Sequence, residues 1–334
     1  MIRILGDINF ADWYFDKGQG VGTSIAKGNN PFKHLNIISD DFWIGNFECV
    51  CAEGIDKPFV ISPNFLDKIQ HLNLYGVANN HSMQVGDTGY NQTLDFLNKK
   101  HIPYVGSNDQ RTNVFSHQGK RIGIMAFSLR PDNFTSAPLY WHIPELTDIE
   151  NEFLRITDCD YKICLVHWGY EYNNHPNIEQ IQLAHWLVDI GFNLIVGMHP
   201  HVAQGAEEYN GGHIFYSLGN SVFNMEWEPT RYGFLVNVDL SGDNPCVFRE
   251  YTKIGEDFFP KIVDDVPDKL SSKYLDFRVL DTIENEKYFA ETLSLYTQYT
   301  KANRKAILKR MLKMPMHAKY DLLSDFVKRR FLHK

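Results

Sequence analysis

Five short apolar runs, each followed by a side chain that can bind a metal ion, constrain this chain more than any other feature. The runs span residues 2–5, 42–46, 74–78, 161–166 and 194–196. Runs of this length that alternate with helix-like stretches are typical of the strands of an α/β protein. In such folds, ligands bind outside the carboxyl ends of the strands. We therefore expect the five loops after these runs to converge on one site.

The last of these loops carries two histidines, His199 and His201, with only Pro200 between them. Gly197 and Pro200 favour a backbone shape that a helix or strand does not allow. Imidazoles two residues apart in an extended loop can point at two neighbouring ions. Taken alone, a pair of solvated loop histidines is the commoner explanation, because short motifs often match by chance. The four similar loops upstream favour the metal interpretation.

Regular spacing predicts the elements around these runs. Apolar residues three and four apart predict helices over 64–73, 86–100 and 178–190. Residues 113–117 and 121–127 predict a hairpin, and further paired strands are expected over 203–209, 213–218, 233–240 and 246–251. Strands that first alternate with helices and then form hairpins indicate an α/β protein with a mixed sheet or two packed sheets.

Composition places the chain among ordinary globular proteins. Of its 334 residues, 43% are apolar and 22% are charged. Its five cysteines form no CxxC pair, which argues against a disulfide framework and a cysteine zinc site and favours a reducing compartment. The apolar stretch at the N-terminus is too short for a signal-peptide core, and no run reaches about 18 apolar residues. We expect a soluble, cytoplasmic protein.

Charge is distributed unevenly along the chain. The net charge is −8, but residues 301–334 hold eleven Lys or Arg against two acids, so the first 300 residues carry about −17. An acidic body makes nucleic acid an unlikely ligand, because phosphate-backbone binding needs a basic face. We expect one domain over residues 1–255 and a mostly helical basic extension over 256–334. Such an extension can lie on anionic lipid, dock on an acidic partner or pack on the acidic body.

The strand-end side chains have the chemistry of a site for divalent metal ions. The candidate ligands are two carboxylates, one amide oxygen and three imidazoles, namely Asp7, Glu48, Asn80, His167, His199 and His201. This set suits Mn, Fe or Zn. Two such ions about 3.5 to 4 Å apart hydrolyse phosphate esters, and His81 is placed to protonate the leaving group. Asp7 as a turn former and Asn79-Asn80 as a turn are the structural alternatives.

Six ordered motifs resemble a known family. They are GDIN (6–9), GNFE (45–48), ANNHS (78–82), HWGYEY (167–172), GMHPH (197–201) and YSLGNSVF (216–223). Together they resemble the CapA family of capsule and poly-gamma-glutamate biosynthesis proteins, which is similar to the calcineurin-like metallophosphoesterases. The resemblance implies a four-layer α/β/β/α sandwich with a dinuclear metal site over about residues 1–250, followed here by the helical extension.

The resemblance also implies roles for the motif residues. Asp7 and Glu48 would be the acidic ligands, Asn80, His167 and His199 would complete one metal site, and His201 would join the acids at the other. His81 would be the general acid. Further motif residues are expected at the substrate or behind the ligands, namely Asn9, Glu171, Tyr172, Ser217 and Asn220.

Two departures from the family pattern leave two functions open. Asn9 stands where phosphoesterases have a histidine, and Gln84 stands where CapA-type sequences usually carry an acid. The leading hypothesis is a metal-dependent hydrolase that acts on an anionic polymer precursor or phosphoester in capsule or exopolysaccharide assembly. The rival is a non-catalytic assembly factor that binds a polymer or a capsule synthase. In either case the basic extension would allow peripheral contact with the inner membrane.

Overall fold

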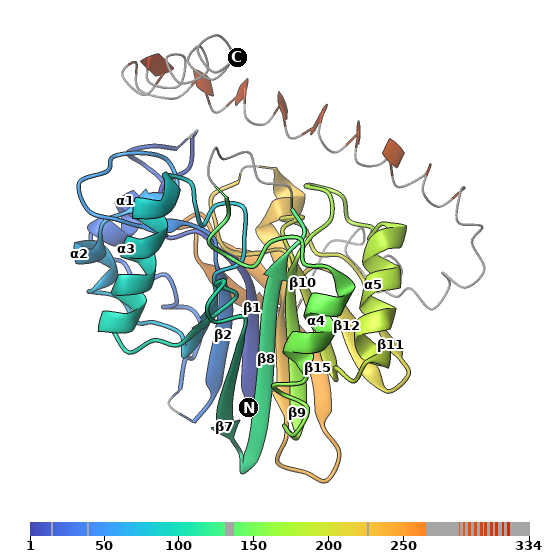
Figure 1. Cartoon of the computed structure of the whole chain (residues 1–334). Coiled ribbons are helices and arrows are strands. Elements are labelled where there is room, and N and C mark those ends of the chain that lie inside the picture. The colour runs from blue at the N-terminus through green and yellow to red at the C-terminus, as the bar shows by residue number, and fades with distance from the viewer. Residues whose placement is uncertain are drawn as a thin grey trace.

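Two β-sheets form the centre of the molecule (Figure 1). The computed structural model describes residues 1–264 except 15, 39, 131–136 and 226, together with scattered positions between 287 and 320. The first sheet has the strand order β16-β15-β14-β1-β2-β5-β6, with β13 also paired to β1. Its strands are β1 (Ile2–Ile8), β2 (Phe42–Phe47), β5 (Leu74–Gly76), β6 (Tyr104–Val105), β13 (Asn220–Val222), β14 (Tyr232–Asp239), β15 (Cys246–Ile254) and β16 (Pro260–Val263).

The second sheet has the order β11-β12-β10-β9-β8-β7. Its strands are β7 (Thr112–His117), β8 (Lys120–Ser128), β9 (Tyr161–His167), β10 (Leu194–Met198), β11 (Ala206–Tyr209) and β12 (Gly212–Phe215). A short ladder joins β3 (Val50–Cys51) to β4 (Val60–Ile61). The helices are α1 (Val21–Ala26), α2 (Pro63–Leu66), α3 (Gly86–Lys99), α4 (Leu146–Phe153), α5 (Ile178–Asp189) and a 3-10 turn, η1 (Glu228–Arg231).

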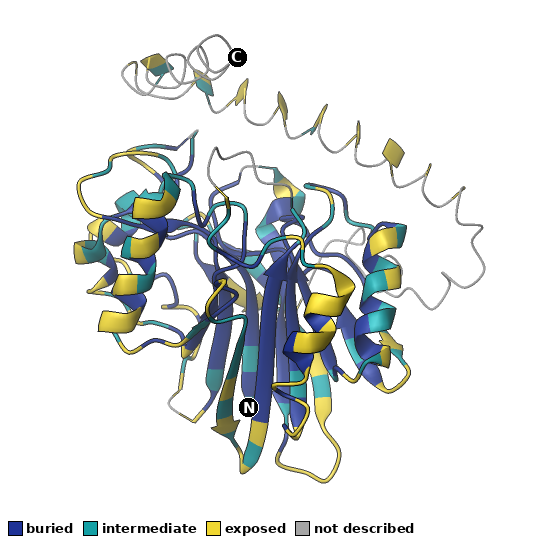
Figure 2. Cartoon of the chain, in the orientation of Figure 1, coloured by how far each residue is buried: buried dark blue, intermediate teal, exposed yellow. Residues whose placement is uncertain are grey.

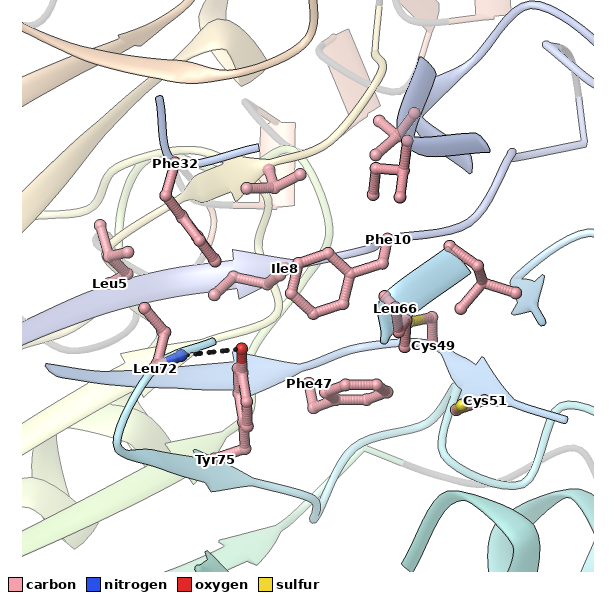
Figure 3. Close-up of a cluster of buried hydrophobic side chains, with 14 of the residues drawn as sticks. Leu5, Ile8, Phe10, Phe32, Phe47, Cys49, Cys51, Leu66, Leu72 and Tyr75 are labelled. Carbon is pink, nitrogen blue, oxygen red and sulfur yellow. Dashed lines mark hydrogen bonds between the residues drawn. The ribbon is translucent and has the colours of Figure 1, made fainter. Parts of the chain in front are cut away.

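Strand alternation creates three apolar layers between four structural layers. In β8, Ile122 and Ile124 pack between the two sheets, whereas Met125 and Phe127 pack against α4 and α5 on the other face. The first sheet likewise buries one face against the second sheet and the other against α1, α2 and α3. Figure 3 shows part of this outer layer, where Phe10 and Phe47 pack edge to face. The architecture is therefore the expected α/β/β/α sandwich.

Burial follows the same layers. Figure 2 shows strands that are mostly buried and outer helices that expose one face. Within the first sheet β1, β2 and β5 are parallel, and within the second β8, β9 and β10 are parallel. The carboxyl ends of each set meet at one edge of its sheet, which is where the metal-capable side chains follow the strands.

Most sequence-based expectations for single elements are confirmed. The hairpin forms as β7 and β8, and the two longer helices form as α3 and α5. The helix expected over residues 64–73 is wrong beyond Leu66. Its second half is turn and loop instead, and Asn73 at its end is bonded to β2, where Asn73 N donates to the Trp43 carbonyl and Trp43 N donates to Asn73 Oδ1. Periodicity alone does not reveal this competing pairing.

The segment after residue 255 is described only in part. Strand β16 lies there and pairs with β15. The described positions between residues 287 and 320 are helical, but the expected extension as a whole lies outside the described residues. Within the described part of the chain, no helix is long and apolar enough to cross a membrane.

Gly197, in β10, gives a first prediction. A Cβ at this position would collide with the backbone carbonyl of Tyr216 and with the indole nitrogen of Trp168. We expect Gly197→Ala to lower the free energy of unfolding by about 1 to 3 kcal/mol, the usual cost of overpacking. Denaturant unfolding measures it. Gly242→Ala is the matched control, since its Cβ would meet nothing closer than 3.7 Å. Equal stability of the two variants would contradict the prediction.

Candidate metal centre

Asp7 projects from β1 into the space between the sheet ends. Register irregularities next to Asp7 in its pairing with both β2 and β13 re-aim this stretch of the strand. The carboxylate is fully buried. Its Oδ1 accepts a 2.8 Å hydrogen bond from Asn46 Nδ2, and its Oδ2 accepts a 3.1 Å bond from the backbone N of His199. Asp7 thus ties the end of the first sheet to the histidine loop of the second.

The loop after β10 holds both of its histidines in left-handed backbone conformations. His199 has φ of 100° and His201 has φ of 59°, values that only a few per cent of residues other than glycine adopt. Both side chains are buried. Strain of this kind persists only where the surroundings enforce it, and it clusters at functional sites.

Glu48 and His199 are buried without hydrogen-bond partners for their side chains among the described residues. Both carboxylate oxygens of Glu48 and both ring nitrogens of His199 lack a hydrogen bond among the described residues. The ligand atoms of Glu48, His199 and His201 lie within 4.8 Å of one another. Orphaned buried polar atoms cost about 1 to 3 kcal/mol each, more when charged. The arrangement is therefore one that a bound cation would complete.

His167 and Asn80 extend the cluster on one side of Glu48. His167 Nε2 lies 2.7 Å from Asn80 Oδ1 and 3.7 Å from Glu48 Oε1. On the other side, His201 Nε2 lies 3.9 Å from the same Glu48 oxygen. His201 Nδ1 lies 2.9 Å from Asn220 Oδ1, a contact that orients the ring as outer hydrogen bonds orient metal-bound imidazoles. All six expected ligands thus lie in one connected cluster.

Burial shifts the proton affinity of the cluster in two directions. Desolvation, opposed by His201 and by hydrogen bonds, raises the pKa of Asp7. Desolvation and the neighbouring Asp7 charge raise the pKa of Glu48 well above its usual value. Desolvation lowers the pKa of His167 and His199 well below theirs. These shifts favour neutral His167 and His199, the form in which imidazoles bind metals, and they favour retention of protons by the two buried acids when no cation is present.

His81 lies at the margin of this cluster and is held on two sides. Its ring stacks on Phe59 with centroids 3.7 Å apart, and its Nδ1 lies 3.0 Å from Gln84 Oε1. Gln84 Nε2 in turn donates to the Tyr14 hydroxyl. With its amide oxygen beside Nδ1, Gln84 can accept a hydrogen bond from that nitrogen when it carries a proton. Gln84 therefore orients His81 as an acid would, without adding a charge.

The remaining sequence candidates occupy different places. Asn9 is buried, with Oδ1 accepting from Ala11 N and Nδ2 without a partner among the described residues. The Tyr172 ring centroid lies 6.2 Å from that of His201. Ser217 is buried, and its hydroxyl accepts from Gly219 N within its own turn. Glu171 is partly exposed and pairs with Arg130.

Three residues that the sequence did not single out also belong to the site. Asn46 Nδ2 lies 3.3 Å from His167 Nδ1 as well as bonding Asp7, and Asn46 Oδ1 accepts from Asn79 Nδ2. Both amides are buried beneath the ligands. Asn46 and Asn79 belong to the motifs GNFE and ANNHS. Their position at strand ends was the one sequence feature that could have identified them as site residues. Arg130 follows the end of β8. The first polar residue at that strand end is Ser128 and not a metal ligand, so no sequence signal marked Arg130.

Fold and site together define the class of protein. The chain is a four-layer α/β/β/α protein with a buried, metal-capable donor cluster at the ends of its parallel strands. It belongs to the family described as bacterial capsule synthesis protein PGA_cap, whose model matches residues 2–225.

Two relatives support this membership. The chain is 32% identical over 221 residues to the PGA biosynthesis protein CapA of Bacillus subtilis (strain 168), covering 60% of this chain and 58% of that one. It is 31% identical over 189 residues to the capsule biosynthesis protein CapA of Bacillus anthracis, covering 51% and 45%. The chain thus spans about half the length of these relatives.

Solved structures give more distant similarities. One is a novel phosphatase of Mycoplasma pneumoniae, with a TM-score of 0.47 and 16% identity over 84% of this chain and 98% of that one. Another is a putative 5'-nucleotidase from Staphylococcus aureus, with a TM-score of 0.47 and 12% identity over 90% and 58%. Similarity at this distance says nothing of activity.

The raised pKa of Glu48 predicts how stability depends on pH in metal-free protein. Above about pH 4.5 the unfolded chain releases the Glu48 proton while the folded chain keeps it, so folding loses stability as pH rises. We expect Glu48→Gln to be stabilised relative to wild type by a margin that grows with pH, by up to about 1.4 kcal/mol per unit. Unfolding free energies at pH 4 to 7 measure this margin.

Glu256→Gln provides the control for this measurement. Glu256 is exposed, and its hydrogen bond with Arg231 lowers its pKa. Glu256→Gln should therefore become less stable relative to wild type as pH rises, which is the opposite of the trend expected for Glu48→Gln. A Glu48→Gln margin that stays constant with pH would show that Glu48 does not hold a proton in the folded state.

Proposed function

We propose that the chain is a metal-dependent hydrolase that acts on a phosphoester or an activated polymer precursor in capsule or exopolysaccharide biosynthesis. The observation that carries this proposal is the full burial of Glu48 and His199 with four ligand atoms lacking partners. A protein rarely keeps such groups without a ligand, because their desolvation is not repaid by the fold itself. Membership of the capsule synthesis family supports the biosynthetic setting.

The proposed cofactors are two divalent ions, Mn, Fe or Zn. Asn80, His167 and His199 would hold one, and Asp7 and His201 would hold the other. Glu48 lies between the two sets, 3.7 Å from His167 Nε2 and 3.9 Å from His201 Nε2. When bound, such ions would activate water and stabilise negative charge on phosphoryl oxygens. The ligand set of nitrogen and oxygen atoms, without thiolate, suits these metals.

His81 is the proposed general acid. Nδ1 of His81 faces Gln84 Oε1, and stacking on Phe59 fixes the plane of the His81 ring. In this proposal, Nε2 of His81 carries the proton that reaches the leaving-group oxygen. Asn46 and Asn79 hold Asp7 and His167 in place beneath the ligands. Residues held this way need little reorganisation during the reaction.

One observation favours the alternative of a non-catalytic assembly factor. Asn9 Oδ1 accepts from Ala11 N, so its amide oxygen is already engaged in its own loop. The half of the site served by His201 then has one imidazole fewer than the phosphoesterase pattern, which weakens the second ion. A metal- or polymer-binding protein of a capsule synthase complex would tolerate that loss.

Metal content and turnover separate the two functions. Protein reconstituted with Mn²⁺ is expected to hold metal and to hydrolyse a generic phosphodiester. Asp7→Ala should lose metal and turnover together, because Asp7 is proposed as a ligand. His81→Gln should keep the metal and lose about 10²- to 10⁴-fold in kcat, as removal of a general acid does. Asp158→Ala removes an exposed acid at the far end of β8 and should change neither.

Each outcome has a definite meaning. Reconstituted protein without metal rules out the hydrolase. Metal binding without turnover of any phosphoester favours the assembly factor. Turnover that Asp7→Ala leaves unchanged rules out the proposed site.

The basic segment 301–334 is the proposed contact with the membrane surface or a capsule synthase. It carries eleven Lys or Arg, and it lies largely outside the described residues. We expect deletion of residues 301–334 to abolish co-sedimentation with vesicles that contain anionic lipid. Neutral vesicles are the control, and wild-type protein that stays in the supernatant with anionic vesicles would contradict the expectation.

A further inference from the structure

Arg130 is held by its backbone directly beside the metal-capable cluster. Leu129 N donates to the His167 carbonyl over 2.9 Å, which fastens the end of β8 to the end of β9. Arg130 N donates to Ser128 Oγ over 3.2 Å, and the Arg130 carbonyl lies 2.9 Å from His142 Nε2. The position of Arg130 is thus fixed next to His167, a proposed ligand.

The guanidinium of Arg130, by contrast, is held loosely. Among the described residues its one ionic partner is Glu171, at 3.7 Å, which is beyond hydrogen-bond distance. The two side chains are 32% and 30% exposed. Arg3, whose Nε donates to Asp41 over 2.6 Å, shows how tightly this fold can hold an arginine. Within the described part of the chain, no side chain therefore engages the guanidinium donors in a hydrogen bond.

Glu171 reaches Arg130 from the loop after β9, which also contacts the histidine loop. Tyr172 N donates to the Pro200 carbonyl over 2.8 Å, so the loop after β9 is fastened to the His199–His201 loop. Burial is the main cause of the shifted pKa values of the ligands, but both charges of the pair contribute. Glu171 adds to the raised pKa of Glu48, and Arg130 adds to the lowered pKa of His167 and His199. The pair therefore lies within electrostatic reach of ligands on both sides of the site.

We propose that Arg130 is the anion-recognition residue of this site and that Glu171 is its internal competitor, released when an anionic group of the substrate binds. The ligand chemistry is an oxyanion, a carboxylate or a phosphate, that accepts two parallel hydrogen bonds from the guanidinium. Binding of the anion by Arg130 does not depend on the proposed function. Only the reaction that would follow binding rests on it. Arg130 contributes a positioning contact to the substrate and takes no part in proton transfer.

An acidic protein that binds an anionic polymer or phosphoester needs a positive charge at its site, and the Arg130–Glu171 pair can supply it. The first 300 residues carry about −17, so a free anion is repelled at long range and needs a local cation at the site. A resting partner such as Glu171 balances the charge of the guanidinium before the substrate arrives, without a hydrogen bond to its donors. Because a half-exposed ion pair stabilises little, its exchange for a substrate oxyanion costs little.

Anion binding to four variants tests the inference. Inorganic phosphate and a γ-linked glutamate trimer are titrated by calorimetry into protein reconstituted with Mn²⁺. Arg130→Ala should weaken the binding of at least one probe about tenfold or more. Glu171→Gln should tighten it about two- to fivefold, the range expected for loss of an exposed competing pair. The probe that responds identifies the source of the oxyanion.

Matched controls come from the opposite end of the same strand. Arg121, at the start of β8, pairs with Asp158, and both side chains are more exposed than the Arg130 pair. Arg121→Ala and Asp158→Asn change the net charge as the test variants do, and they should leave binding unchanged.

A double variant separates competition from general repulsion. If Glu171 acts by occupying Arg130, Glu171→Gln should have little effect once Arg130→Ala is present. An effect of equal size in both backgrounds would overturn the competitor role, and Arg130→Ala that binds both probes like Arg121→Ala would overturn the recognition role. The titrations can also be made on metal-free protein, so a failure of the proposed hydrolase leaves this result readable.

Discussion

The burial of ionisable side chains is the constraint on which the site depends. Asp7 and Glu48 are fully buried beside three imidazoles, and the hydrogen bonds within the cluster satisfy only some of their atoms. Asn46 and Asn79 supply neutral donors beneath the ligands and leave the face toward Glu48 unsatisfied. The two sheets and their loops therefore support a cluster whose unsatisfied atoms a bound cation would satisfy.

The six ligand candidates from the sequence lie together in the structure, and their roles as ligands stay a prediction. Six ligand candidates could be found because each follows an apolar run, and parallel strands bring such positions to one edge. The residues that hold them were not recognised. Asn46 lies within a strand, where a polar side chain fits the usual alternation of polar and apolar residues. Arg130 follows a strand whose first polar residues resemble no metal-binding motif. Their roles arise from contacts over 30 or more residues, which local patterns do not contain.

The family pattern was equally informative about what differs in this chain. Gln84 replaces an expected acid, yet its amide oxygen faces His81 because Tyr14 accepts from its nitrogen. Asn9 replaces an expected histidine, and its oxygen turns to its own loop. The first replacement preserves orientation and removes a charge, whereas the second removes a ligand. The sequence shows both replacements, but only the packing shows that their consequences differ.

The bond from His199 N to Asp7 links residues 192 positions apart, and it has a consequence for folding. Candidate ligands drawn from residues 7 to 201, on both sheets, come together only after the sheets have docked, so the unfolded chain would offer no preformed metal site. Metal would then bind late and close a very long loop. Such a closure slows the opening of the sandwich more than its formation, so the ions would also act as a kinetic lock on the finished fold.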